Sequence, residues 1–150
     1  MSIRNKAFIA GIYEHPTRKA TDKSVAQLHA ESAAGALNDA GLGADDVDAY
    51  YCAGDAPGLG ALSMMDYMGL KNIRHMDSTE TGGSSYVVHV GHAAQAIAMG
   101  KANVALITLA GRPRADGMAT GTAPRNYDAT APDVPFEFIY GPTVVNMYAM

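Results

Sequence analysis

The stretch of residues 76–110 constrains the fold of this chain more than any other part. Polar residues lead to Gly82-Gly83-Ser84-Ser85, and the residues from Ser84 to Met99 are then mostly small or apolar. A helix without a polar face is usually buried, so we predict a buried helix there. The stretch ends in Val104–Ala110, a nearly continuous apolar run that is typical of parallel strands covered on both faces. We therefore expect a turn, a buried helix and a buried strand in this order.

The residues before this stretch alternate between strand and helix signals. Ser24, with Gln27 three residues later, forms a capping-box pattern that starts a helix, and Gly41 is placed to end it. A short helix is expected at Ala61–Met68. The expected strands are Lys6–Tyr13, in which Gly11 suggests a close backbone approach, Val47–Cys52 and a weaker Ile73–Met76. This alternation predicts an α/β fold with a mostly parallel sheet.

The end of the chain gives weaker signals. Residues 111–135 have no usable period, which is unusual inside a compact domain unless the segment is functional or poorly ordered, so it is either a lid candidate or an artefact of a fragment. Thr143–Met150 resembles the opening of a helix that stops after about two turns. We expect residues 1–150 to form one domain that is incomplete at its C-terminus.

Composition excludes several classes of protein. The chain of 150 residues is 48% hydrophobic and 17% charged, which suits a globular domain with a substantial core. Its net charge of −4 and scattered basic residues argue against nucleic acid as a partner. A single cysteine rules out an internal disulfide framework, and no stretch approaches the roughly 18 apolar residues of a membrane span. We expect a cytoplasmic protein without a membrane partner.

The series of elements resembles a known family. The matching pieces are the opening strand with its Gly-containing turn, Ala-Leu-Asn-Asp-Ala-Gly-Leu at residues 36–42, Asp45-Asp46-Val47-Asp48, Ala-Ile-Ala-Met-Gly at 96–100, the strand Asn103–Ile107, and Phe136-Glu137-Phe138 with Tyr140-Gly141-Pro142. In this order they resemble the N-terminal half of the thiolase superfamily, particularly the branch close to the thiolase domain of sterol carrier protein. The resemblance implies a layered α/β fold. It also implies a homodimer in which the strand near Ile73–Ser78 pairs with its twofold mate.

The resemblance also indicates where chemistry would occur. Thiolases place a reactive cysteine where a strand turns into a helix, because the helix N-terminus favours the thiolate. Counting back from Gly100 puts this position at Gly82 or Gly83, and glycine has no side chain to acylate. Ser84 could replace the cysteine only with an adjacent base, so we favour helix capping by Ser84. We predict that Gly82, Gly83, Ser84 and Ser85 bind the substrate, because a helix N-terminus can hold an oxyanion or a thioester carbonyl.

A subset of thiolase-like proteins also lacks this cysteine. These proteins cleave coenzyme A thioesters by a retro-aldol reaction, as in steroid side-chain degradation, together with a zinc-binding OB-fold partner of the DUF35 type. Gly82-Gly83-Ser84-Ser85 resembles that subset better than it resembles true thiolases. The resemblance thus implies an acyl-coenzyme A substrate, no bound cofactor, and a role in lipid or steroid metabolism for the parent protein.

Two other functions stay open. The chain could be a non-catalytic thiolase-like subunit that binds acyl-coenzyme A or serves as a scaffold, or a fragment of an acetyl-coenzyme A acetyltransferase. The catalytic His and the second Cys of thiolases belong to the later half of the fold. We therefore expect residues 1–150 alone to be inactive in thiolysis.

The remaining candidate residues have structural explanations that we favour. His89 and His92 could ligate a metal only with a third group, so we expect core or dimer-facing histidines and no metal site. Cys52 is expected to be buried and inert, and Gly54, Gly58 and Gly60 to serve turns. Three arginines of the late loop could bind coenzyme A phosphates, but we expect them to be solvated: Arg112, Arg114 and Arg125. Three methionines at helical spacing are expected to fill the core or an interface rather than bind a cofactor: Met64, Met65 and Met68.

Overall fold

The computed structural model describes residues 2–117, 132 and 134–137, and divides the chain into two compact units, Met1–Gly111 and Arg112–Met150. The second unit contains the short helix α4 (Val134–Glu137). The first unit contains the other elements, which are α1 (Val25–Ala40), the 3₁₀ turn η1 (Ala44–Asp46), β1 (Ala49–Tyr51), α2 (Ala61–Tyr67), β2 (His75–Asp77), α3 (Ser85–Ala98) and β3 (Ala105–Ile107). No helix among the described residues is long and apolar enough to span a membrane.

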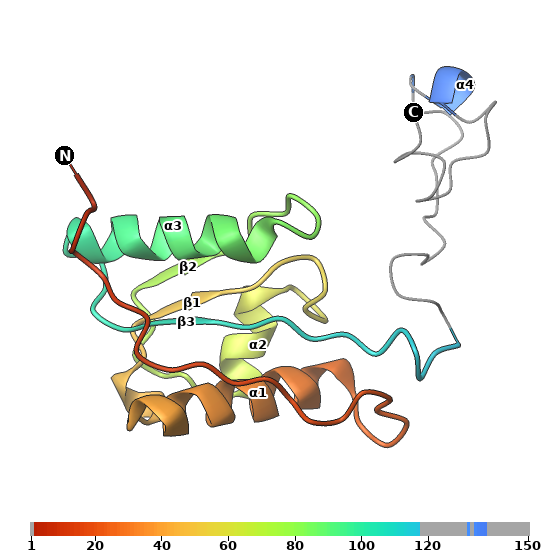
Figure 1. The fold of residues 1–150 in the computed structure, drawn as a ribbon, viewed down its shortest axis with the longest axis horizontal. Coiled ribbons are helices and arrows are strands. Elements are labelled where there is room, and N and C mark those ends of the chain that lie inside the picture. The colour runs from red at the N-terminus through yellow and green to blue at the C-terminus, as the bar shows by residue number, and fades with distance from the viewer. Residues whose placement is uncertain (1, 118–131, 133, 138–150) are drawn as a thin grey trace. The chain divides into compact units, whose positions relative to one another are not determined.

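The three strands form one parallel sheet in the order β2-β1-β3. Helix α3 covers one face of the sheet, while α1 and α2 cover the other (Figure 1). Successive side chains of β1 face opposite layers, because strand side chains alternate. Tyr50 packs with Met64 of α2 and Ala33 of α1, whereas Tyr51 packs with Ala93 of α3. The predicted α/β fold with a parallel sheet is confirmed.

The predicted ends of α1 are also confirmed. The Ser24 hydroxyl accepts a hydrogen bond from the Gln27 amide at 3.1 Å, as an N-cap does. At the other end, Gly41 takes a left-handed conformation with φ of 68°, and the Leu42 amide donates to the Leu37 carbonyl at 2.9 Å. This pairing is the Schellman motif, which satisfies carbonyl groups at the end of the helix.

The prediction of a first strand at Lys6–Tyr13 is wrong. These residues have an extended trace without ladder pairing, and Phe8 and Ile9 are 83% and 75% exposed. The segment instead lies against α1: a Cβ atom on Gly11 would come within 2.4 Å of the Ala36 carbonyl oxygen, and one on Gly35 within 2.3 Å of the Tyr13 ring. The predicted close approach at Gly11 is confirmed, but its partner is a helix rather than a strand.

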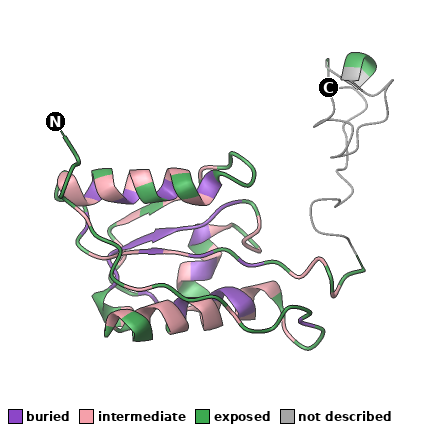
Figure 2. Ribbon diagram, viewed as in Figure 1, coloured by how far each residue is buried: buried purple, intermediate pink, exposed green. Residues whose placement is uncertain are grey.

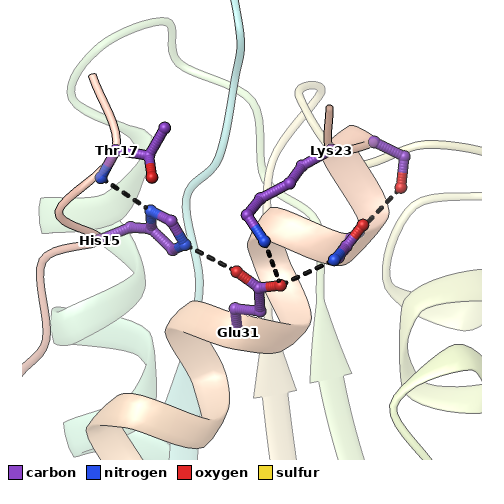
Figure 3. A network of polar contacts seen from close by, with 6 residues as sticks. His15, Thr17, Lys23 and Glu31 are labelled. Carbon is purple, nitrogen blue, oxygen red and sulfur yellow. Dashed lines mark hydrogen bonds and ion pairs between the residues drawn. The ribbon is translucent and has the colours of Figure 1, made fainter. Parts of the chain in front are cut away.

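A polar cluster fastens this N-terminal segment to α1 (Figure 3). The His15 ring accepts from the Thr17 amide through Nδ1 at 3.1 Å, which leaves Nε2–H to donate to Glu31 at 2.7 Å. The other Glu31 oxygen accepts from Lys23 and Gln27, each at 2.8 Å. Hydrogen bonds from Lys23, His15 and Gln27 lower the pKa of Glu31 to about 2. Glu31 therefore stays ionised and joins the segment to the helix.

The helix of the central stretch is present, but it is not buried on all sides as predicted. Residues Ser85, His89, Ala93 and Ala96 of α3 are buried, while Val87 and Val90 are 75% and 45% exposed. Figure 2 shows β1 as buried and α3 as partly exposed. The reason is that the sheet of this unit covers only one side of α3. An apolar periodicity indicates that a face can be buried, but it does not identify what covers it.

The other elements match with shifted bounds. The strands expected at Val47–Cys52 and Val104–Ala110 contain the shorter β1 and β3, and the third strand begins at His75 rather than at Ile73. The expected short helix corresponds to α2. The predictions for Arg125 and Thr143–Met150, and most of those for residues 111–135, lie outside the described residues.

Candidate functional site

The candidate site lies where the three parallel strands end. Asp77 is the last residue of β2, and Cys52 and Thr108 directly follow β1 and β3. In open α/β sheets, ligands bind beyond the carboxyl ends of the strands. The loop after β2 then leads into the N-terminus of α3, so the predicted turn at residues 81–85 belongs to the same edge.

Serine 85, not Ser84, organises this turn. The Ser85 hydroxyl accepts from the Thr81 amide at 2.8 Å and lies 2.7 Å from the Gly82 carbonyl oxygen, to which it donates. Ser84 makes no side-chain cap, and its hydroxyl donates to the Thr81 carbonyl at 3.0 Å. The predicted capping by Ser84 is wrong because its backbone is helical, with φ of −89° and ψ of −5°, whereas a capping residue normally has extended dihedrals.

The carboxylate of Glu80 accepts hydrogen bonds from two backbone amides at the turn. It accepts from the amides of Gly54 and Gly82, each at 2.6 Å, and these two bonds hold the pKa of Glu80 below its ordinary value. The Gly82 amide is therefore engaged within the chain. No side chain in the described part accepts from the amides of Gly83 or Ser84. Glu80 is not among the residues predicted from the sequence, although an acidic residue just before a helix N-terminus is a recognisable signal.

The turn glycines leave open space. Gly82 has φ of 69°, a left-handed conformation that favours glycine, and an added Cβ atom would meet nothing within 4 Å. Gly83 is also open, and its φ is not in the left-handed region. A bound group could therefore approach the backbone here. The assignment of Gly82, Gly83, Ser84 and Ser85 to substrate binding remains a prediction.

Asp55, in the loop after β1, accepts hydrogen bonds from two elements. The Tyr86 hydroxyl of α3 donates to Oδ1, and the Ala110 amide donates to Oδ2 at 2.9 Å. Nε2 of the buried His29 lies 3.1 Å from Oδ2, which is an ion-pair distance without the alignment of a hydrogen bond. Burial raises the pKa of Asp55, but the contacts with His29, Tyr86 and Ala110 outweigh it and lower the pKa overall. Asp55 is thus a carboxylate at neutral pH.

Two buried hydroxyl groups, those of Thr108 and Tyr50, form a hydrogen-bonded series with His29. Nδ1 of His29 lies 2.8 Å from the Thr108 hydroxyl, and the Tyr50 hydroxyl lies 2.7 Å from the same oxygen. If Nε2 carries the hydrogen toward Asp55, Thr108 donates to Nδ1 and Tyr50 donates to Thr108. The series Thr108–His29–Asp55 superficially resembles a catalytic triad. Thr108 is only 3% exposed, so the series supports Asp55 rather than offering a nucleophile.

The two histidines of α3 have different surroundings. His89 is fully buried, and neither of its ring nitrogens has a partner among the described residues. Its ring centroid lies 5.8 Å from that of Tyr51 and 5.9 Å from that of Tyr86, which confirms a core histidine. Nδ1 of His92 lies 2.5 Å from Asp77. Within the described ranges no three His, Cys, Asp or Glu side chains gather closely enough to hold a metal ion.

Cys52 is buried, as predicted. It is 0% exposed, its nearest polar partner is the Ser78 hydroxyl at 3.9 Å, and burial raises the pKa of its thiol. A protonated thiol without access to solvent is a poor nucleophile. The only cysteine of the chain is therefore unsuited to accept an acyl group.

The remaining predicted roles are largely structural. Gly58 and Gly60 have φ of 69° and 63° and serve turns, while Gly54 lies against Glu80. Met64 is 1% exposed, and the two later methionines pack against the same core cluster: Met65 and Met68. Arg112 pairs with Asp116 in the second unit.

Several solved structures resemble the chain, including the following three. The Ltp2-ChsH2(DUF35) aldolase matches with a TM-score of 0.72 and 25% sequence identity over 89% of this chain and 33% of that chain. The 3-oxoacyl-[acyl-carrier-protein] synthase III of Aquifex aeolicus VF5 matches with a TM-score of 0.53 and 19% identity over 60% of this chain and 30% of that chain. The 3-oxoacyl-(acyl carrier protein) synthase III of Pseudomonas aeruginosa PAO1 matches with a TM-score of 0.51 and 22% identity over 59% of this chain and 28% of that chain.

The sequence comparisons add no closer relative. No protein-family model matches the sequence, and neither does any curated protein. The chain spans about a third of the length of the solved chains that it resembles. None of these matches singles out the sterol-carrier-protein branch, which stays a prediction. The structural matches support the thiolase-like superfamily. The chain has a partial thiolase-like α/β fold.

Proposed function

We propose that the protein forms or cleaves a carbon–carbon bond on a coenzyme A thioester by aldol chemistry, as part of a longer chain or assembly. The observation that carries the proposal is the open glycine turn at the N-terminus of α3, combined with a single cysteine that is fully buried after β1 and does not belong to the turn. Acyl transfer in thiolases needs a cysteine nucleophile, and the turn at residues 81–85 contains no cysteine. The match to an aldolase, at 25% identity, supports the same direction.

Aldol cleavage has two requirements that this edge of the sheet can meet. A base must take the proton of the β-hydroxyl group, and donors must stabilise the enolate oxygen that forms on the thioester. The amides of Gly83 and Ser84, in the open turn at the start of α3, are the proposed donors. Tyr86, in the first turn of α3, donates a hydrogen bond to the ionised Asp55, and this pair is the proposed source of the base.

We also propose two protein partners. The aldolase that matches the chain contains a DUF35 component, which supports a DUF35 protein as the partner of this one. Strand β2 is an outer strand of the described sheet, and an open outer strand can pair with another chain. A homodimer formed through residues 73–78 would use this edge.

The test uses the full-length protein, purified with any protein that copurifies. It is incubated with straight-chain, 3-branched and ring-bearing 3-hydroxyacyl-coenzyme A thioesters. We expect release of an aldehyde or ketone together with a shortened acyl-coenzyme A. No cleavage of any of these thioesters, with or without partner protein, would overturn the proposal.

The Gly83→Val variant tests the turn itself. Gly83 tolerates a side chain in the described structure, so the variant is expected to fold. Its side chain would crowd the proposed oxyanion donors, and loss of one such donor typically costs about 10²- to 10³-fold in rate. Gly43→Val, at another open glycine before η1, is the matched control and should keep full activity. Unchanged cleavage by a folded Gly83→Val protein would show that the turn is only structural.

A non-catalytic acyl-coenzyme A carrier is the second candidate function. The observation in its favour is that the Glu80 carboxylate already accepts hydrogen bonds from the Gly54 and Gly82 amides. These two amides are therefore not free to stabilise an enolate. A carrier would bind acyl-coenzyme A, as isothermal calorimetry can measure, and return it unchanged. An acetyltransferase is disfavoured by the burial of Cys52.

A further inference from the structure

We propose that Tyr86 is the acid–base residue of the aldol reaction, and that it exchanges the substrate proton with Asp55. This inference rests on the proposed function and deepens it. Tyr86 directly follows Ser85 in the first turn of α3, so its side chain starts beside the open Gly82-Gly83 turn. Its hydroxyl donates to Asp55, which leaves the lone pairs of the phenol oxygen available to accept a proton from a ligand.

The surroundings of this pair fit a proton-transfer role. Both residues are partly exposed rather than enclosed in the core, and the Asp55 side chain is 20% exposed. Burial and the neighbouring Asp55 raise the pKa of Tyr86, while Asp55 itself stays ionised. The pair therefore rests as a neutral phenol that donates to a carboxylate. The proton of this hydrogen bond can reside on the Tyr86 oxygen or on Oδ1 of Asp55.

The buried hydrogen-bonded series behind the pair fixes its geometry. His29 lies against Asp55 from α1, and Thr108 after β3 holds the His29 ring. The Ala110 amide fixes the same carboxylate oxygen that faces His29. Asp55 is thus held from two sides with Oδ1 directed at Tyr86. His29 and Thr108 are positioning residues in this scheme, because they act through Asp55.

The proton balance of the proposed step closes without another reactant. The β-hydroxyl proton moves to the Tyr86 oxygen as the Tyr86 proton moves to Asp55. The bond between the α- and β-carbons breaks, the β-carbon leaves as a carbonyl, and the electron pair forms an enolate whose oxygen lies at the Gly83 and Ser84 amides. The proton returns from Asp55 through Tyr86 to the α-carbon, which yields the shortened thioester and restores the pair.

The test compares Tyr86→Phe with Tyr67→Phe in the full-length protein, with the best-cleaved 3-hydroxyacyl-coenzyme A of the activity assay as substrate. Tyr67 is 57% exposed at the end of α2, so its variant is the control with unchanged activity. General acid–base catalysis contributes about 10²- to 10⁴-fold. We expect Tyr86→Phe to lose a factor of this size in kcat with little change in KM. If Tyr86 had only a structural role, Tyr86→Phe would instead raise KM or lower the melting temperature.

Asp55→Asn is the second variant, and it decides the outcome if Tyr86→Phe does not fold. It keeps the shape of Asp55 but removes the proton acceptor, so it should also lose kcat rather than affinity. A Tyr86→Phe or Asp55→Asn protein that folds and keeps wild-type kcat would overturn this inference and leave the proposed function intact. A wild-type protein that cleaves none of the thioesters would overturn both.

Discussion

At the scale of single residues, Asp48 makes a sharp prediction. Its carboxylate accepts from the amides of Asn103 and Val104, at 2.8 and 2.9 Å, and from the Asn103 side chain at 2.9 Å. These bonds fix the start of β3 beside β1. Asp48→Asn puts an amide group where donors converge, so it should lower the free energy of unfolding by about 1–3 kcal/mol at pH 7. Asp45→Asn, on the exposed 3₁₀ turn, is the control in urea denaturation.

The effect of Asp48→Asn should depend on pH. Burial raises the pKa of Asp48, but the bonds from Val104 and Asn103 prevail and the pKa is lowered. The stabilisation is therefore present above the ordinary aspartate pKa and is lost as the pH falls through the lowered value. The difference between wild type and variant should shrink below about pH 4. A difference that stays constant to pH 2 would contradict this account.

Residue types predicted the turn before α3, but not which atoms meet in it. The turn at residues 81–85 was predicted from its glycines and serines, and the structure places it at the start of α3. Which of two adjacent serines organises the turn depends on the backbone angles of Ser84, and these do not follow from residue type. The link from Asp55 to Tyr86 joins residues 31 positions apart in sequence, and no local pattern encodes it.

At the scale of elements, the N-terminal segment shows what local pattern cannot decide. Its apolar run was interpreted as a strand because short apolar runs favour strands, but pairing requires a free partner edge and a matching register. Here two glycines let the segment pack closely on α1 instead. Helix α1 was predicted well because its capping serine and terminal glycine act locally. Central strand β1 was recognisable because both of its faces are buried.

Gly11→Ala tests the packing of this segment. The added methyl group would lie 2.4 Å from the Ala36 carbonyl oxygen, a backbone atom of α1 that cannot move aside easily. The segment should therefore lift from the helix, and limited chymotrypsin digestion should cut after Phe8 or Tyr13 faster than in wild type. Gly43→Ala, where the nearest atom is 3.8 Å away, should digest like wild type. Equal digestion of Gly11→Ala and wild type would show that the segment is not held at Gly11.

At the scale of the whole molecule, the structure presents surfaces that the described sheet does not cover. The outer side of α3 exposes Val87 and Val90, and β2 and β3 are the outer strands of the sheet. The chain spans about a third of the solved chains that it resembles. The sequence therefore predicted the α/β fold of this unit and its thiolase-like character, but not which of its apolar surfaces stay exposed, because an apolar pattern does not identify what covers it.

The most direct test of the account is whether the protein works without a covalent acyl intermediate. The full-length protein and its Cys52→Ala variant are incubated with 3-hydroxyacyl-coenzyme A thioesters, and products and intact protein mass are measured together. Because Cys52 is buried with a raised thiol pKa, we predict equal cleavage by both proteins and no acyl adduct on either. Thiolytic or acyl-transfer activity with an adduct on Cys52 or Ser84 would contradict the aldol account.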